Sequence, residues 1–153
     1  MTIRKVMAMR EILYRGKSKR SGEWKYGYLV ELGKESFSDP DRYGISHKGV
    51  PLGSNNVCFN LKIDEVIPET VGQYSGLLDK NGTKIFEGDI VKDDYLFGKV
   101  VFATAADDFD GMAGFMVDDI DNGYQNYNGL WHLVEVVGNI HDNPELLRGV
   151  NDE

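Results

Sequence analysis

Apolar and polar residues alternate along much of this chain, which is the pattern of β-strands that bury one face. Within residues 11–32, two alternating runs flank a polar turn at residues 18–22, and this arrangement predicts a β-hairpin. The second run places Trp24, Tyr26 and Tyr28 on one face. Aromatic residues at every second position favour a buried strand face over an exposed platform for stacking bases.

The middle of the chain contains two further predicted turns. Asp79-Lys80-Asn81-Gly82 separates two apolar segments, and Asn-Gly supplies the positive-φ residues of a tight hairpin. Glu87-Gly88-Asp89 follows as a second turn, after which the β-rich run resumes. Further strands are predicted at residues 57–63, 97–102, 114–117 and 130–137.

The remaining segments complete a prediction of an all-β fold. Residues 33–54 contain two prolines and several glycines, so we predict a long loop there, with a helix and an α+β fold as the alternative. Asn143 followed by Pro144 predicts the cap and first position of a short C-terminal helical turn. Short strands with turns rich in glycine and asparagine favour a small, partly open barrel of antiparallel strands.

Three segments carry a family resemblance. Residues 69–91 contain ETVGQY, GL, DKNG and IFEGDIV, residues 9–24 contain MREI, RGK and GEW, and residues 138–147 read GNIHDNPELL. In this order they resemble the YopX family of phage and prophage proteins. The resemblance implies a small, mainly β protein carried by mobile elements, with no established reaction and no catalytic residues to transfer. It spans nearly the whole chain.

The resemblance also sets the expected organisation of the chain. We predict one YopX-like domain over residues 9–148, with a hairpin part over about 9–66 and a barrel part over about 67–148. Residues 1–8 form an N-terminal extension outside the pattern, so that Met9 is an alternative start, and residues 149–153 form a tail.

Charge is distributed unevenly along the sequence. Residues 1–25 carry a net charge of +6, and the rest of the chain carries −14, which gives the overall −8. The single cysteine, Cys58, and the lack of a signal-peptide pattern lead us to expect a cytoplasmic protein of the bacterial host cell. No apolar run approaches the length of a membrane span.

No residue pattern predicts catalytic, metal or cofactor chemistry. The three histidines lack neighbours at zinc-ligand spacing, and none of the three acidic turns that contain glycine keeps the EF-hand pattern. Cys58 lies between apolar residues, which favours an inert thiol. Glu87 and Asp89 are interpreted as turn residues rather than as a catalytic pair. We therefore expect a protein without cofactor, metal or small-molecule substrate, and not an enzyme.

The leading functional prediction is an interaction or self-assembling protein, because a basic end and an acidic end can attract each other between protomers. The expected interaction surface comprises Arg15, Lys17, Lys19, Arg20 and Lys25. Nucleic acid is the less favoured partner. It would be bound by this basic hairpin, or mimicked by the acidic residues 93–121 so as to block a host DNA-binding enzyme.

Overall fold

Antiparallel strands form most of the described structure, as predicted. The structure, a computed structural model, describes residues 11–34, 36–47, 62–104, 113–126 and 130–148, and helical structure in these ranges is limited to three short 3-10 turns. The strands are β1 (Tyr14–Lys17), β2 (Trp24–Leu32), β3 (Arg42–His47), β4 (Ile63–Val66), β5 (Gly72–Leu78), β6 (Lys84–Phe86), β7 (Asp89–Lys92), β8 (Phe97–Ala103), β9 (Gly114–Asp119), β10 (Gly123–Gln125) and β11 (Glu135–Asn139). The 3-10 turns are η1 (Pro68–Thr70), η2 (Trp131–Leu133) and η3 (Pro144–Leu147).

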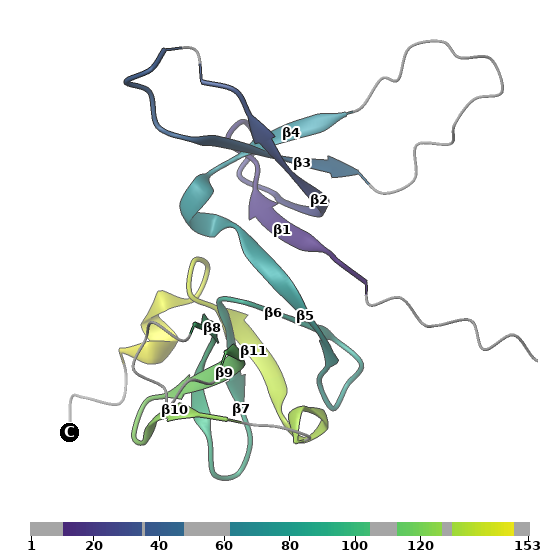
Figure 1. Ribbon diagram of the computed structural model, residues 1–153. Helices are drawn as coiled ribbons and strands as arrows, with labels where there is room; N and C mark the ends of the chain where they lie inside the picture. Colours follow the sequence, from purple (N-terminus) through teal and green to yellow (C-terminus); the bar gives the residue numbers. More distant parts are fainter. Residues whose placement is uncertain (1–10, 35, 48–61, 105–112, 127–129, 149–153) are drawn as a thin grey trace, which may run out of the picture.

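The strands make two sheets, in the orders β4-β3-β2-β1-β5-β6 and β10-β9-β8-β7-β11. Strand β5 runs from the N-terminal sheet down to the C-terminal one (Figure 1). Neither sheet closes into a barrel. The edge strand β4 nevertheless returns to the end of β1, where Ser18 bridges Val66 and the Lys19 N–H donates to the Glu65 carbonyl at 2.8 Å.

The main apolar core belongs to the C-terminal sheet. Seven buried side chains pack there, with Phe115 and Val136 against them: Ile85, Val91, Leu96, Val100, Val117, Trp131 and Val134. A smaller cluster of Leu13, Tyr74 and Phe86 lies where β1, β5 and β6 meet. All three residues lie in the N-terminal sheet or directly before it, so this second cluster packs β5 and β6 against the start of β1.

The two predicted turns form as the sequence indicates. Gly82 and Gly88 have φ angles of 81° and 83°, which L-residues rarely adopt. Asp79 Oδ1 accepts hydrogen bonds from the Asn81 and Thr83 N–H groups, both at 2.8 Å, while Oδ2 accepts one from Val136 at 3.0 Å. Burial raises the pKa of Asp79, but these donors outweigh it, so the net pKa is below the ordinary value.

The prediction of a long loop over residues 33–54 is wrong, because β3 lies inside it. Gly44, one of the glycines that argued against a helix there, pairs with Val30 on one side and Glu65 on the other. A Cβ at Gly44 would lie 2.3 Å from Ile63 Cγ2, so glycine permits the close approach of β3 and β4. Of the strand predicted over 57–63, only Ile63 enters β4; residues 48–61 lie outside the described part of the chain.

The last predicted strand is shorter and later than expected. Trp131 and Val134 are both buried in the core. They can be so because residues 131–133 form the 3-10 turn η2, and β11 begins only after Val134. The apolar run over 130–137 therefore reflects a 3-10 turn plus a strand rather than one strand with two covered faces. Pro144 does begin η3 as predicted, but Asn143 makes no side-chain cap; its Oδ1 instead accepts from the Asn139 N–H at 3.3 Å.

Candidate functional site

Arg15 is the most enclosed of the five predicted interaction residues. Its guanidinium Nη2 lies 2.6 Å from Asp89 Oδ1, and the two side chains are only 7% and 2% exposed. Nη2 also donates to the Glu87 carbonyl at 3.2 Å, and the guanidinium lies over the rings of Trp24 and Phe86, 4.7 and 5.0 Å from their centroids. Burial raises the pKa of Asp89, and the positive charge of Arg15 acts against that rise.

Lys17 lies two residues further along the same strand face and forms an ion pair with Asp142. Asp142 also accepts hydrogen bonds from Trp24 Nε1 at 2.7 Å and Asn139 Nδ2 at 2.9 Å. The bonds from Asn139, Lys17 and Trp24 hold the pKa of Asp142 far below its ordinary value. His141 lies next to this group, and burial together with the nearby Arg15 and Lys17 charges lowers its pKa.

Three segments that are distant in sequence therefore meet at one junction. They are residues 15–17 on β1, the turn at residues 87–89, and the loop at residues 139–142. The Ile140 N–H completes the junction by donating to the Gly88 carbonyl at 2.9 Å. These are parts of the same segments that carry the family resemblance. The shared feature of those segments is thus a network of ion pairs and hydrogen bonds that fixes one sheet against the other.

A groove lies beside the Arg15–Asp89 pair. Its volume is about 370 Å³, and Leu13, Tyr26 and Phe86 provide apolar walls while Lys84 lies at one side. Tyr26 contacts Phe86 edge-on at 5.6 Å between centroids. Apolar walls with a few charged groups suit binding of a protein side chain, but Arg15 and Asp89, which also line the groove, are already paired with each other.

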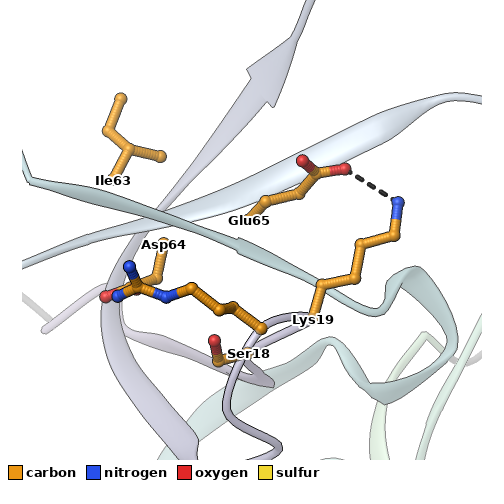
Figure 2. A pocket seen from close by; sticks show the side chains of 6 residues that line it. Ser18, Lys19, Ile63, Asp64 and Glu65 are labelled. Atoms are coloured by element: carbon orange, nitrogen blue, oxygen red, sulfur yellow. Dashed lines mark hydrogen bonds and ion pairs between the residues drawn. The ribbon is translucent and has the colours of Figure 1, made fainter.

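A second hollow, of about 460 Å³, lies at the tip of the β1–β2 hairpin. Figure 2 shows Lys19 directed toward Glu65, with Ser18, Ile63 and Asp64 around them. Lys19 Nζ and Glu65 Oε1 are 3.0 Å apart, and Arg42 binds the same carboxylate at 2.9 Å. Hydrogen bonds from Arg42 and Lys19 lower the pKa of Glu65 to about 2. Arg20 lies 3.9 Å from Asp64 but is 90% exposed.

The five predicted cations are thus distributed over different environments. Arg15 and Lys17 hold the sheet junction, Lys19 and Arg20 face β4, and Lys25 pairs with Glu23 at 3.0 Å. Each lies within 4.0 Å of a carboxylate of the same chain. Basic residues near the N-terminus therefore form ion pairs with acidic residues of the same molecule. Binding of a partner by these residues stays a prediction.

The prediction that Tyr26 and Tyr28 lie on a buried face is wrong. They are 47% and 48% exposed, and Trp24 is partly exposed. The alternation of β2 was interpreted correctly as a strand, but the described chain covers this face only in part: Phe86 contacts Tyr26, and both tyrosines stay about half exposed. Sequence reasoning also missed Asp142, although the loop that carries it belonged to the quoted segment at residues 138–147.

The described residues also bear on metal binding and on membrane spanning. Within those ranges, no three His, Cys, Asp or Glu side chains come together as a metal site would require. The described ranges likewise contain no helix with the length and hydrophobicity needed to cross a membrane.

Comparisons with known proteins identify a family. Residues 13–148 match the YopX protein family. No curated protein matches the chain. Among solved structures, the crystal structure of protein EF1440 from Enterococcus faecalis is similar at 26% identity, covering 90% of this chain and 98% of that one, with a TM-score of 0.48.

Proposed function

Because this chain belongs to the YopX family, as its three motif segments indicated, we propose that it is a phage or prophage protein that acts by binding protein, its own copies included, rather than by catalysis. The observation that carries the proposal is the half-exposed pair Tyr26 and Tyr28 on one face of β2. Ile63 of β4 lies on this same face of the sheet, since it pairs with Ser46, which itself pairs with Tyr28.

Tyr26 and Tyr28 leave part of their aromatic surface in contact with water. Tyrosine combines a large apolar body with a polar hydroxyl, and it is enriched in protein interfaces for that reason. Burying apolar surface contributes about 25 cal/mol per Å², so a partner that covers two half-exposed tyrosines gains more than one that covers an ordinary charged surface. Arg42, on the neighbouring strand β3, is already paired with Glu65, so its charge does not require a charged group from a partner.

The test is site-specific photocrosslinking from this face. Tyr28 is replaced by p-benzoylphenylalanine in the full chain, and irradiation is carried out on the pure protein and in extract of the bacterial host. We expect an adduct at twice the 17.2 kDa mass of the chain, or an adduct with one defined second protein. Nuclease treatment should leave the adduct unchanged.

The control is the same replacement at Phe37, which is fully exposed on the segment between β2 and β3. Accessibility alone would give this position at least as much adduct as Tyr28. Equal labelling at the two positions, or no protein adduct at Tyr28 under either condition, contradicts the proposal.

A further inference from the structure

A second apolar surface lies on the C-terminal sheet, away from Tyr26 and Tyr28. It is a hollow of about 380 Å³ between the β7–β8 turn and η2, with Tyr95, Leu130 and Leu133 in its lining. Tyr95 is 92% exposed, and each leucine is about half exposed, at 47% and 49%. Single apolar residues scattered over a protein surface need no explanation, but three large ones around one hollow indicate a contact site.

The architecture forces these side chains outward. In the β7–β8 turn, Asp93 Oδ1 accepts hydrogen bonds from the N–H groups of Tyr95 and Leu96, at 2.7 and 2.8 Å. Leu96 then enters the core, so Tyr95 is left outside. In the same way, Trp131 is buried in η2 while the flanking Leu130 and Leu133 face solvent. The exposure is thus fixed by ordered structure.

The rim of the hollow is acidic. Asp93 and Asp94 line it together with Lys80, and Lys80 Nζ is bound to Glu135 Oε2 at 2.7 Å. The charge of Lys80 is thus already paired with Glu135, while Asp93 and Asp94 leave two carboxylates in the lining. A complementary partner must offer apolar side chains for the hollow and more than one positive charge for its rim.

The chain itself contains a segment with this chemistry. Residues 1–10, MTIRKVMAMR, hold Arg4, Lys5 and Arg10 with no acidic residue, and most of the others are apolar. They precede Glu11, whose carboxylate binds Lys84 at 2.8 Å. Lys84 lines the groove beside Arg15 and not the acidic hollow. Ten residues span at most about 36 Å when fully extended, so the segment is long enough to leave the groove beside Arg15.

We propose that residues 1–10 of a second copy of this chain dock into the hollow formed by Tyr95, Leu130 and Leu133. This inference rests on the proposed protein-binding function and specifies one partner for it. Reciprocal exchange of the two segments gives a closed dimer with two identical contacts. Methionine side chains in the segment suit an irregular apolar hollow because they are unbranched and flexible.

The experiment measures the molar mass of the full chain by light scattering over a range of concentrations, at low salt and at about 1 M salt. We expect a dimer of twice 17.2 kDa that dissociates more readily at high salt. Tyr95→Ser and Asp94→Lys should each raise the dissociation constant about tenfold or more, and so should the double change Arg4→Glu with Lys5→Glu.

The decisive sample combines Asp94→Lys with Arg4→Glu and Lys5→Glu, because reversing both charges should restore association toward the wild-type value. A matched control, Asp121→Lys, changes an exposed aspartate in the β9–β10 turn and should leave the dimer intact. Failure of the combined variant to recover, or equal weakening by Asp121→Lys, would overturn the inference.

Two other outcomes would also overturn it. A mass that stays at 17.2 kDa at every concentration excludes the second copy as occupant. A dimer unaffected by all four changes places the contact elsewhere. In both cases a Tyr28 crosslink that exceeds the Phe37 control still supports the protein-binding function, so the two proposals fail separately.

Discussion

Arg15 and Asp89 form a buried ion pair that joins β1 of the N-terminal sheet to the first residue of β7 in the C-terminal sheet. Asp89 Oδ2 additionally accepts the Phe86 N–H at 2.8 Å, so one carboxylate closes a turn and anchors a distant strand. Trp24 and Phe86 contact the guanidinium of Arg15 and shield the pair from water. A charge that is desolvated in this way depends on its partner.

Removing one partner should therefore be costly. We expect Asp89→Ala to lower the free energy of unfolding by about 3–5 kcal/mol, because it leaves the Arg15 charge buried and unpaired. Urea unfolding followed by circular dichroism measures the loss. As a control, Arg20→Ala removes the exposed partner of Asp64 and should change the free energy of unfolding by less than about 1 kcal/mol. Similar effects from both changes would contradict this account of the junction.

Acid should weaken the junction through Asp142. Its pKa is lowered in the folded protein by Asn139, Lys17 and Trp24, so the unfolded chain takes up the proton first as the pH falls. The resulting stability is present above the ordinary aspartate pKa of about 4 and is lost progressively below it. Asp142→Asn should be less stable than the wild type at pH 7, and this difference should shrink toward pH 2. Urea unfolding at several pH values tests this; parallel pH profiles for the two proteins would rule it out.

Gly27 is expected to tolerate no side chain. A Cβ at this position in β2 would lie 1.8 Å from the Ser46 carbonyl oxygen, a backbone atom that cannot move without disturbing β3. We expect Gly27→Ala to cost at least about 1–3 kcal/mol in the free energy of unfolding, seen as a lower thermal midpoint. Gly33→Ala is the matched control, since a Cβ there would meet nothing within 4 Å. An unchanged midpoint for Gly27→Ala would mean that β2 and β3 pair differently.

Local stability should differ between the sheets. The large buried cluster lies around β7 and β8, whereas in the described part of the N-terminal sheet Ile45 and Val66 are the buried aliphatic residues of β3 and β4. We expect backbone amides of β7 and β8 to exchange with deuterium most slowly, and those of β3 and β4 to exchange earlier. Hydrogen exchange followed by mass spectrometry measures this order. Equal protection would show that the two sheets unfold as one unit.

Binding of DNA by the hairpin should be weak. Lys17, Lys19 and Arg20 each face a carboxylate, so a phosphate must compete with an existing ion pair, and the net charge of −8 opposes its approach. We expect little retention on immobilised duplex DNA at about 50 mM salt, and no change when the three residues are replaced by glutamate. Strong retention that this triple change removes would instead favour the nucleic-acid alternative.

Several features were predictable because they depend on neighbours in sequence. The turns at residues 79–82 and 87–89 formed as expected, since Gly82 and Gly88 adopt positive φ and an aspartate side chain satisfies N–H groups within each turn. The hairpin of β1 and β2 followed from alternation. Strand β3 was missed because its glycine is explained by Ile63, a residue of another strand. Gly44 and Ile63 are far apart in sequence, so the local pattern could not predict their contact.

The candidate site shows the same division. The amino-acid sequence by itself determined the family, the all-β class, the turns and the uneven charge, because alternation, glycine placement and charge are local properties. Only the tertiary structure decided that Arg15 and Lys17 are bound to Asp89 and Asp142, that Tyr26 and Tyr28 are exposed, and that Tyr95 shares a hollow with Leu130. Burial and ion pairing depend on which distant segments come together, and alternation along one strand does not specify what covers its face.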